Sequence, residues 1–175
     1  NTDNVALGLF GEVSGTIKNL NITSSSLTVT GNKSARIGLL CGYLNGTSAI
    51  ITNCHITTGT INSTNFTTAA NARVSTGLLV GEMYNSTVKY SSASTSVSAF
   101  GYAGGLIGRT QSQNNRNHAT ILGCSFTGEV NAVYERTGGW EDDWGEFLGT
   151  GRGAYAGGIV GNADDDTEIN LCYVN

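Results

Sequence analysis

Short apolar runs closed by glycine recur five times along the chain, at 8–11, 39–42, 78–81, 106–108 and 159–161. A polar turn follows each of them, and then a second run in which an isoleucine or valine is followed three residues later by Leu, Cys or Ser. These second runs lie at 17–22, 51–56, 88–93, 121–126 and 169–174. A third and looser apolar run follows at 27–29, 61–66, 97–100 and 130–133.

This pattern predicts stacked β-structure. Short β-prone runs separated by Gly, Ser, Thr and Asn are typical of strands and turns rather than helices. The closing glycines are 31, 39, 27 and 53 residues apart, which is the size of one solenoid coil. One coil cannot bury its apolar face alone, so neighbouring coils must stack. The glycines would serve corners with positive φ or close backbone approach.

We therefore predict one all-β domain over residues 1–175, a parallel β-helix of about five coils. The long fourth step places an insertion at about 134–154. The alternative is an antiparallel sandwich of similar strands, and the uneven repeat length is the main argument for it.

These runs resemble the GLUG-motif repeat, named for a Gly-Leu-apolar-Gly run followed by an I-x-x-C segment. The resemblance spans about residues 7–174, with Ser91 in place of the cysteine in the third repeat. It implies a non-catalytic structural or adhesive region of a large secreted or cell-surface protein, of the kind also found in the non-catalytic parts of immunoglobulin A peptidases. We expect this sequence to be part of a longer chain.

Composition narrows the function classes. The chain has 25 Gly, no Pro, 13% charged residues and a net charge of −4, while 39% hydrophobic residues argue against disorder. No basic cluster suits nucleic acid, and no apolar run is long enough for a membrane-spanning helix. The expected partners are adjacent repeats, other copies of the chain, and host or environmental glycans or proteins.

The four cysteines occupy apolar positions of the repeat. Cys54, Cys124 and Cys172 share one position with Leu20 and Ser91, and Cys41 shares another with Val80 and its equivalents. Free cysteine packs as a small buried hydrophobe, so we predict buried thiols. A disulfide between Cys124 and Cys172, on adjacent coils, is the exception left open. The spacing does not suit zinc.

The insertion carries both tryptophans beside four acids, and it is the predicted ligand site. Sugar binding there would use the ring faces and carboxylates of Trp140, Glu141, Asp142, Asp143 and Trp144. Exposed aromatic residues equally suit a protein interface. A third reading is a surface excursion whose tryptophans fold back over the solenoid.

No catalytic constellation is evident, so we predict a chain that is not an enzyme and has no cofactor or metal. The segment Asp164–Asp166 with Glu168 has oxygen ligands for Ca²⁺ but lacks the spacing of an EF-hand loop. A β-helical polysaccharide-active enzyme would require acids and a basic residue in one plane, and no such cluster is marked.

Two further motifs concern asparagine. Asn-x-Ser/Thr sequons, which become glycosylated only if the source performs this modification, occur at Asn21, Asn32, Asn45, Asn62, Asn65 and Asn85. Asn19 and Asn53 share a repeat position and are predicted to stack as a hydrogen-bonded pair.

Overall fold

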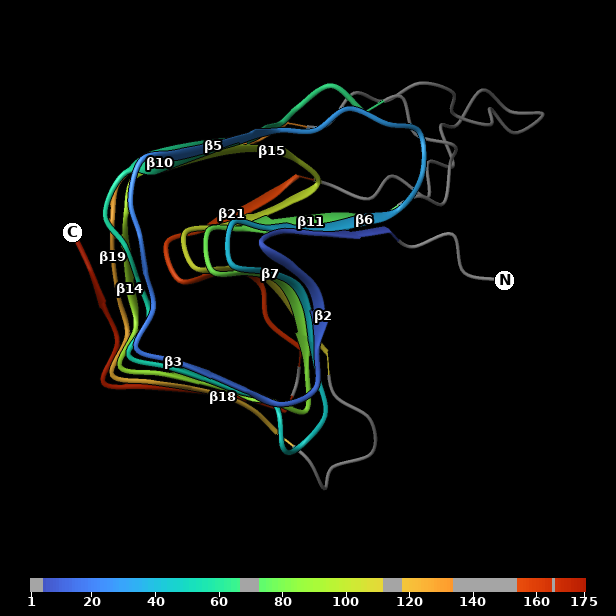
Figure 1. Ribbon diagram of the computed structural model, residues 1–175. Helices are drawn as coiled ribbons and strands as arrows, with labels where there is room; N and C mark the ends of the chain where they lie inside the picture. Colours follow the sequence, from blue (N-terminus) through green and yellow to red (C-terminus); the bar gives the residue numbers. More distant parts are fainter. Residues whose placement is uncertain (1–4, 67–72, 112–117, 134–153, 165) are drawn as a thin grey trace, which may run out of the picture.

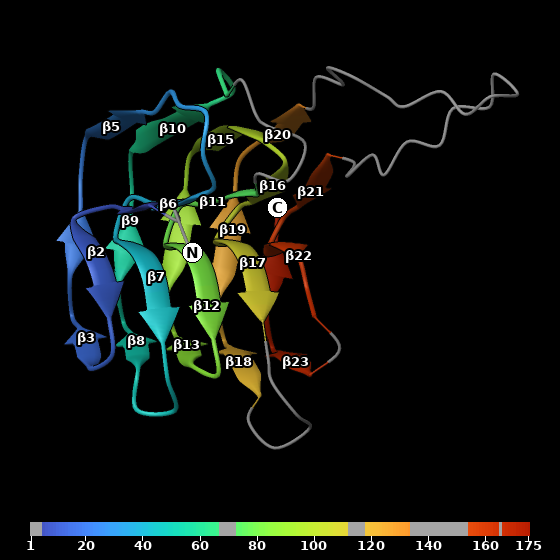
Figure 2. The same cartoon turned by 90° about the vertical axis from the view of Figure 1, so that its right-hand side faces the viewer.

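The computed structural model describes residues 5–66, 73–111, 118–133, 154–164 and 166–175, which form a parallel β-helix (Figure 1). The chain passes through five sheets, here named A to E, in each coil. Four coils contribute a strand to every sheet, and the described part of the fifth contributes to sheets A to D. Figure 2 shows the coils side by side, from β2 and β3 at one end to β22 and β23 at the other.

The strands of each sheet are given in coil order. Sheet A holds β1 (Val5–Leu7), β6 (Ala35–Gly38), β11 (Val74–Gly77), β16 (Tyr102–Gly104) and β21 (Tyr155–Gly157). Sheet B holds β2 (Phe10–Val13), β7 (Cys41–Asn45), β12 (Val80–Tyr84), β17 (Ile107–Gln111) and β22 (Val160–Asn162). Sheet C holds β3 (Thr16–Lys18), β8 (Ile50–Thr52), β13 (Thr87–Lys89), β18 (Ala119–Leu122) and β23 (Thr167–Asn170). Sheet D holds β4 (Asn21–Ile22), β9 (His55–Ile56), β14 (Ser92–Ser94), β19 (Ser125–Thr127) and β24 (Tyr173–Val174). Sheet E holds β5 (Ser25–Thr28), β10 (Gly59–Ser63), β15 (Ser96–Phe100) and β20 (Val130–Val133).

Every strand pairing within these sheets is parallel and joins successive coils. The pairing runs from the first coil to the last in sheets A to D, and from the first to the fourth in the described part of sheet E. The predicted parallel β-helix of about five coils is confirmed, and the antiparallel sandwich is excluded. The three runs of each repeat correspond to five strands, because the first run forms the turn into sheet B and follows a separate strand in sheet A, and a corner splits the second run between sheets C and D.

Equivalent apolar residues stack into columns that run along the helix axis. One column of sheet C consists of Ile17, Ile51, Val88, Ile121 and Ile169. The three central members are fully buried, whereas Ile169 in the last coil is 43% exposed. Burial therefore depends on having a coil on both sides, as expected for a repeat that is held together by its nearest neighbours.

Sheet A crosses the interior of the solenoid rather than lying on its outside. Figure 1 shows it between sheet E and the region enclosed by sheets B, C and D. Ser63 of sheet E and Thr76 of sheet A are joined across this interior by a 2.8 Å hydrogen bond between their hydroxyls. None of the described residues forms a helix long and apolar enough to cross a membrane.

The recurring glycines allow the backbones of sheets A and B to lie in direct contact, with no side chain between them. A Cβ on Gly81 of sheet B would lie 2.6 Å from the carbonyl carbon of Arg36 in sheet A and 2.7 Å from the oxygen of Gly42. Both distances are far inside van der Waals contact. Of the two roles predicted for the repeat glycines, close approach is the one required at this position.

Most of the uneven repeat length is absorbed between sheets E and A, and a smaller part between sheets B and C, where 2 to 7 residues join the strands. Gly101 alone joins β15 to β16, with φ of +79°, and this accounts for the shortest step of 27 residues. Residues 64–73 separate β10 from β11, and residues 134–154 separate β20 from β21. Extra residues at this corner leave the register of the walls unchanged.

The corner between sheets C and D requires left-handed backbone in every coil. Its column consists of Asn19, Asn53, Tyr90, Gly123 and Leu171, with φ between +51° and +60°. Asparagine and glycine tolerate this region, whereas other residues are strained there. The amide of Asn53 donates a 2.8 Å hydrogen bond to Oδ1 of Asn19, which confirms the predicted stacked pair.

Replacing Gly81 with alanine should destabilise the fold strongly, because the new methyl group overlaps the backbone of sheet A. We expect a loss of about 2 kcal/mol or more in the free energy of unfolding, measured by urea denaturation. Gly15→Ala is the matched control, since nothing lies within 4 Å of the added Cβ. Equal losses in the two variants would contradict the close-approach explanation.

Replacing Leu171 with glycine should stabilise the chain by roughly 1 kcal/mol, because leucine is strained in the left-handed region and its side chain is 86% exposed. The melting temperature of the two proteins would measure this difference. Leu9→Gly removes another exposed leucine, from a position without positive φ, and should be neutral or destabilising. A stabilised Leu9→Gly variant would show that side-chain exposure, rather than backbone strain, is responsible.

Candidate functional site

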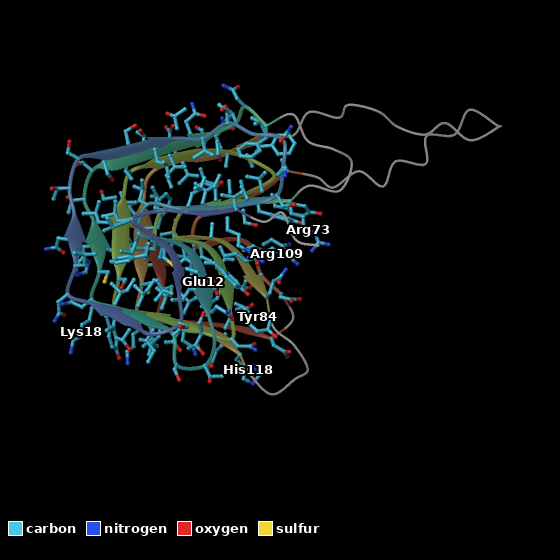
Figure 3. The ribbon with its side chains drawn as sticks, turned by 45° about the vertical axis from the view of Figure 1, so that its right-hand side comes forward. Glu12, Lys18, Arg73, Tyr84, Arg109 and His118 are labelled. Carbon is cyan, nitrogen blue, oxygen red and sulfur yellow. The ribbon has the colours of Figure 1, made fainter. Side chains whose placement is uncertain are left out.

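Polar and aromatic side chains gather where sheets A and B diverge after the glycine turn. Sheet A supplies one column, of Arg36, Ser75, Tyr102 and Tyr155. Sheet B supplies a second, of Glu12, Tyr43, Glu82, Arg109 and Asn162. We refer to these nine residues as the Arg–Tyr face, and Figure 3 labels Glu12 and Arg109 within it.

An ion pair joins two coils within this face. Nε of Arg36 donates a 2.8 Å hydrogen bond to Oε1 of Glu82, whose side chain is almost completely buried. The same guanidinium lies 3.9 Å from the centre of the Tyr43 ring. Burial raises the pKa of Tyr43 above its usual value, and the nearby positive charge of Arg36 opposes this rise. The ion pair and the ring contact tie the second coil to the third, which indicates a structural role.

The other half of the Arg–Tyr face is more accessible. The rings of Tyr102 and Tyr155 lie one above the other in successive coils, tilted by 34° with their centres 5.3 Å apart, and Tyr155 is 45% exposed. The guanidinium of Arg109 lies 5.5 Å from the Tyr102 ring centre, and the Gln111 amide oxygen accepts from its Nη1 at 2.6 Å. Nε of Arg109 is buried without a hydrogen-bond partner in the described structure. Stacked tyrosines beside a guanidinium offer a ring face and a charged donor to a ligand.

The predicted ligand residues Trp140, Glu141, Asp142, Asp143 and Trp144 lie outside the described residues. The described chain stops at Val133, the last residue of β20, and resumes at Ala154, immediately before Tyr155. The insertion is therefore attached next to the accessible half of the Arg–Tyr face. Sequence reasoning missed this face because its members come from different coils and from strands on either side of the glycine turn, although the tyrosine recurrence at 102 and 155 is a weak signal.

The six sequons differ in accessibility. Asn21, Asn32, Asn62 and Asn65 are exposed, and Asn45 is half-buried with its amide donating to Glu12 at 3.0 Å. Asn85 is only 7% exposed and has φ of +48°. The folded chain therefore has room for a glycan at the exposed positions and little room at Asn85.

The acidic segment does not form a metal site in the described structure. Asp165 lies outside it, and the described residues contain no group of three potential metal ligands. The backbone N–H of Asp164 donates to Oγ1 of Thr110 at 2.9 Å.

His55 lies on the outer wall, within hydrogen-bond distance of Ser92 at 2.8 Å and Asn53 at 3.0 Å.

All four cysteines are free thiols, and three are buried. Burial raises the pKa of Cys41 to about 12 and that of Cys124 to about 11, so neither forms the reactive thiolate near neutral pH. Cys172 lies in the last coil, directly beyond Cys124, and is partly exposed. Cys54 is 1% exposed.

Both ends of the solenoid present unpaired strands and apolar side chains. Leu9 and Phe10 are exposed in the first coil, and Ile169, Leu171 and Val174 are exposed in the last. We call these surfaces the first-coil face and the last-coil face. Their inward columns are continuous with the buried core, so each face is a section through that core.

Comparisons with protein-family models, curated proteins and solved structures find no match for this chain.

One thiol per chain should react with a soluble disulfide reagent at pH 8 in dilute native protein, and four should react in guanidinium. Only Cys172 is accessible among the four, so Cys172→Ser should remove the native reaction. A native count of zero with only two thiols after unfolding would instead show a Cys124–Cys172 disulfide.

Proposed function

We propose that this chain is a non-catalytic structural and adhesive module of a secreted or cell-surface protein, built from GLUG-type repeats. The observation that carries the proposal is the continuity of the apolar columns from the core to both exposed ends. A solenoid with this geometry is extended by adding coils, which suits a stalk, a spacer or a fibre subunit. Its partners are then adjacent repeats or further copies.

The outer wall favours an extracellular setting. Its outward positions in sheets C, D and E are mostly Ser, Thr and Asn, with few charges, as at Thr52, Ser94 and Thr60. The pairing of such residues between coils is structural, since the hydroxyls of Ser26 and Thr60 lie 3.2 Å apart. The wall thus supports an extended surface of low charge rather than a reaction centre.

A carbohydrate-binding module is the second candidate, and the stacked tyrosines favour it. Tyr102 and Tyr155 form a partly exposed aromatic platform at the attachment point of the insertion that carries Trp140 and Trp144. Aromatic rings pack against the apolar face of a sugar while nearby polar groups bond its hydroxyls. On this reading, adhesion is mediated by glycans that bind beside sheets A and B.

Beads coated with the chain should be retained on at least one surface of a panel of polysaccharides, glycoproteins and whole cells, without releasing reducing ends from the polysaccharides. Retention would be measured under flow, and released sugar by a reducing-end assay. Tyr155→Ala tests the aromatic platform. Tyr90→Ala is its control, because Tyr90 is also exposed but lies at the corner between sheets C and D.

The outcomes separate the candidates. Retention that survives Tyr155→Ala supports adhesion through another surface, and retention lost only in Tyr155→Ala supports glycan binding at the platform. Release of reducing ends would overturn the non-catalytic assignment. Beads that adhere to no surface would overturn the adhesive role.

A further inference from the structure

The third and fourth coils carry a positively charged surface beside the Arg–Tyr face, and we propose that it binds a polysaccharide with carboxylate groups, such as a chain of uronic acids. The proposal rests on the second candidate function and names the class of glycan. We call this the Arg73–Arg109 surface, and it consists of Arg73, Tyr84, Tyr102, Arg109 and Gln111. Both coils have a coil on each side, so the surface does not depend on where the chain begins and ends.

The alternation of side chains along the strands places these residues on one side of the solenoid. Arg73 comes two residues before Ser75, and its carbonyl continues the pairing of sheet A by accepting from the N–H of the preceding coil. Gln111 comes two residues after Arg109 in sheet B, and it pairs with Tyr84. Residues two apart on a strand point to the same face. Figure 3 shows Arg73, Tyr84 and Arg109 on the same side of the molecule. Arg73 is exposed, and the other four residues of the surface are half-buried.

Arginine is concentrated on this side of the molecule. The structure describes three arginines, Arg36, Arg73 and Arg109, which belong to the second, third and fourth coils. Glu82 neutralises Arg36 through their 2.8 Å contact. No described carboxylate lies within ion-pair distance of Arg73 or Arg109. In a chain with a net charge of −4, this surface therefore keeps two guanidinium groups without an acidic partner among the described residues.

The register shows which contact Arg109 lacks. Arg36 of sheet A donates to Glu82 of sheet B in the next coil, and one coil further along the equivalent positions hold Ser75 and Arg109. The hydroxyl of Ser75, which is 1% exposed, and Nε of Arg109 are both buried without a hydrogen-bond partner in the described structure. A guanidinium thus occupies the position that a carboxylate has one coil earlier, so its acidic partner would be supplied by a ligand.

The terminal nitrogens of Arg109 can exchange their present acceptor for a carboxylate. The amide oxygen of Gln111 accepts from Nη1 at 2.6 Å and from Nη2 at 3.1 Å. A neutral amide is a weaker acceptor than a carboxylate, which binds a guanidinium through two parallel hydrogen bonds. A ligand carboxylate can therefore replace Gln111 on Arg109, and the freed amide can bond to a neighbouring hydroxyl of the same ligand.

The neighbouring rings favour a sugar as the carrier of the carboxylate. The Arg109 guanidinium lies 5.5 Å from the centre of the Tyr102 ring, and Tyr84 lies one coil away from Gln111. Aromatic rings pack against the apolar face of a pyranose while polar groups bond its hydroxyls. A uronic acid offers this face and a carboxylate in one residue. Its polymer repeats the carboxylate along a chain, which suits two guanidinium groups on successive coils.

Equilibrium binding of labelled oligosaccharides tests the proposal. Fluorescence anisotropy at low ionic strength would be measured with oligomers of galacturonate, alginate and hyaluronate, and with methyl-esterified oligogalacturonate as an uncharged counterpart. We expect at least one carboxylated oligomer to bind, and esterification of oligogalacturonate to weaken its binding about 10-fold. Added salt should weaken the binding of the carboxylated oligomer, because it screens charges at the surface.

Substitutions of Arg109 test the site itself. Arg109→Gln should weaken binding of the carboxylated oligomer about 10-fold, and Arg109→Lys should restore only part of it, because an ammonium lacks the planar fork. Lys89→Gln is the matched control, since it removes one positive charge from sheet C of the third coil and should leave binding unchanged. The urea midpoint of each variant would show that it is folded.

Three results would overturn the proposal. They are a failure of every carboxylated oligomer to bind at millimolar concentration, unchanged binding by folded Arg109→Gln, and an equal loss in Lys89→Gln. Equally tight binding of oligoglutamate or of a sulfated dextran would overturn the assignment to a carboxylated glycan, because negative charge alone would then be recognised. Bead retention on uncharged glycans that is lost in Tyr155→Ala would leave the second candidate function standing even if no carboxylated oligomer binds, so the two failures are distinguishable.

Discussion

The contact on which the rest of this structure depends is the backbone approach between sheets A and B. Sheet A crosses the interior, and the chain must then reverse into sheet B without room for a side chain between them. A Cβ at Gly42, Gly81, Gly108 or Gly161 would overlap the backbone of a neighbouring strand, whereas at Gly11 in the first coil its nearest neighbour lies at 3.3 Å. This contact explains why the first run ends in glycine in all five repeats, whereas the residues of the other runs differ from repeat to repeat.

This turn also determines which side chains of sheets A and B face each other. Because the strands touch at the turn and then diverge, side chains a few residues further along face each other across the opening. Arg36 meets Tyr43 and Glu82 there, and the first two are only seven residues apart in the chain. The Arg–Tyr face is thus a consequence of the turn. Its half around Arg36 and Glu82 holds two coils together, and its half around Tyr102 and Tyr155 is accessible.

Much of the fold could be predicted from sequence because the apolar positions recur in order. The cysteine positions also aligned correctly, with Cys41 paired with Val80 and Cys54 level with Ser91. The separation of sheets A and B could not be predicted, since an apolar run with glycines reads as one strand. The register pairs Gly77 with Gly104 and Gly104 with Gly157 at the end of the sheet A strands. The Arg36–Glu82 pair was missed because 46 residues separate its members.

The longest insertions lie where the chain passes from sheet E to sheet A. Length variation is tolerated between sheets E and A, where Gly101 alone suffices in one coil and 134–154 are accommodated in another. Loops of this kind tolerate insertion because the entropy of loop closure grows only slowly with length. Because sheet A begins at this corner, residues inserted there join the described chain beside the Arg–Tyr face. The length of the chain can therefore vary at this corner without disturbing the register of the coils.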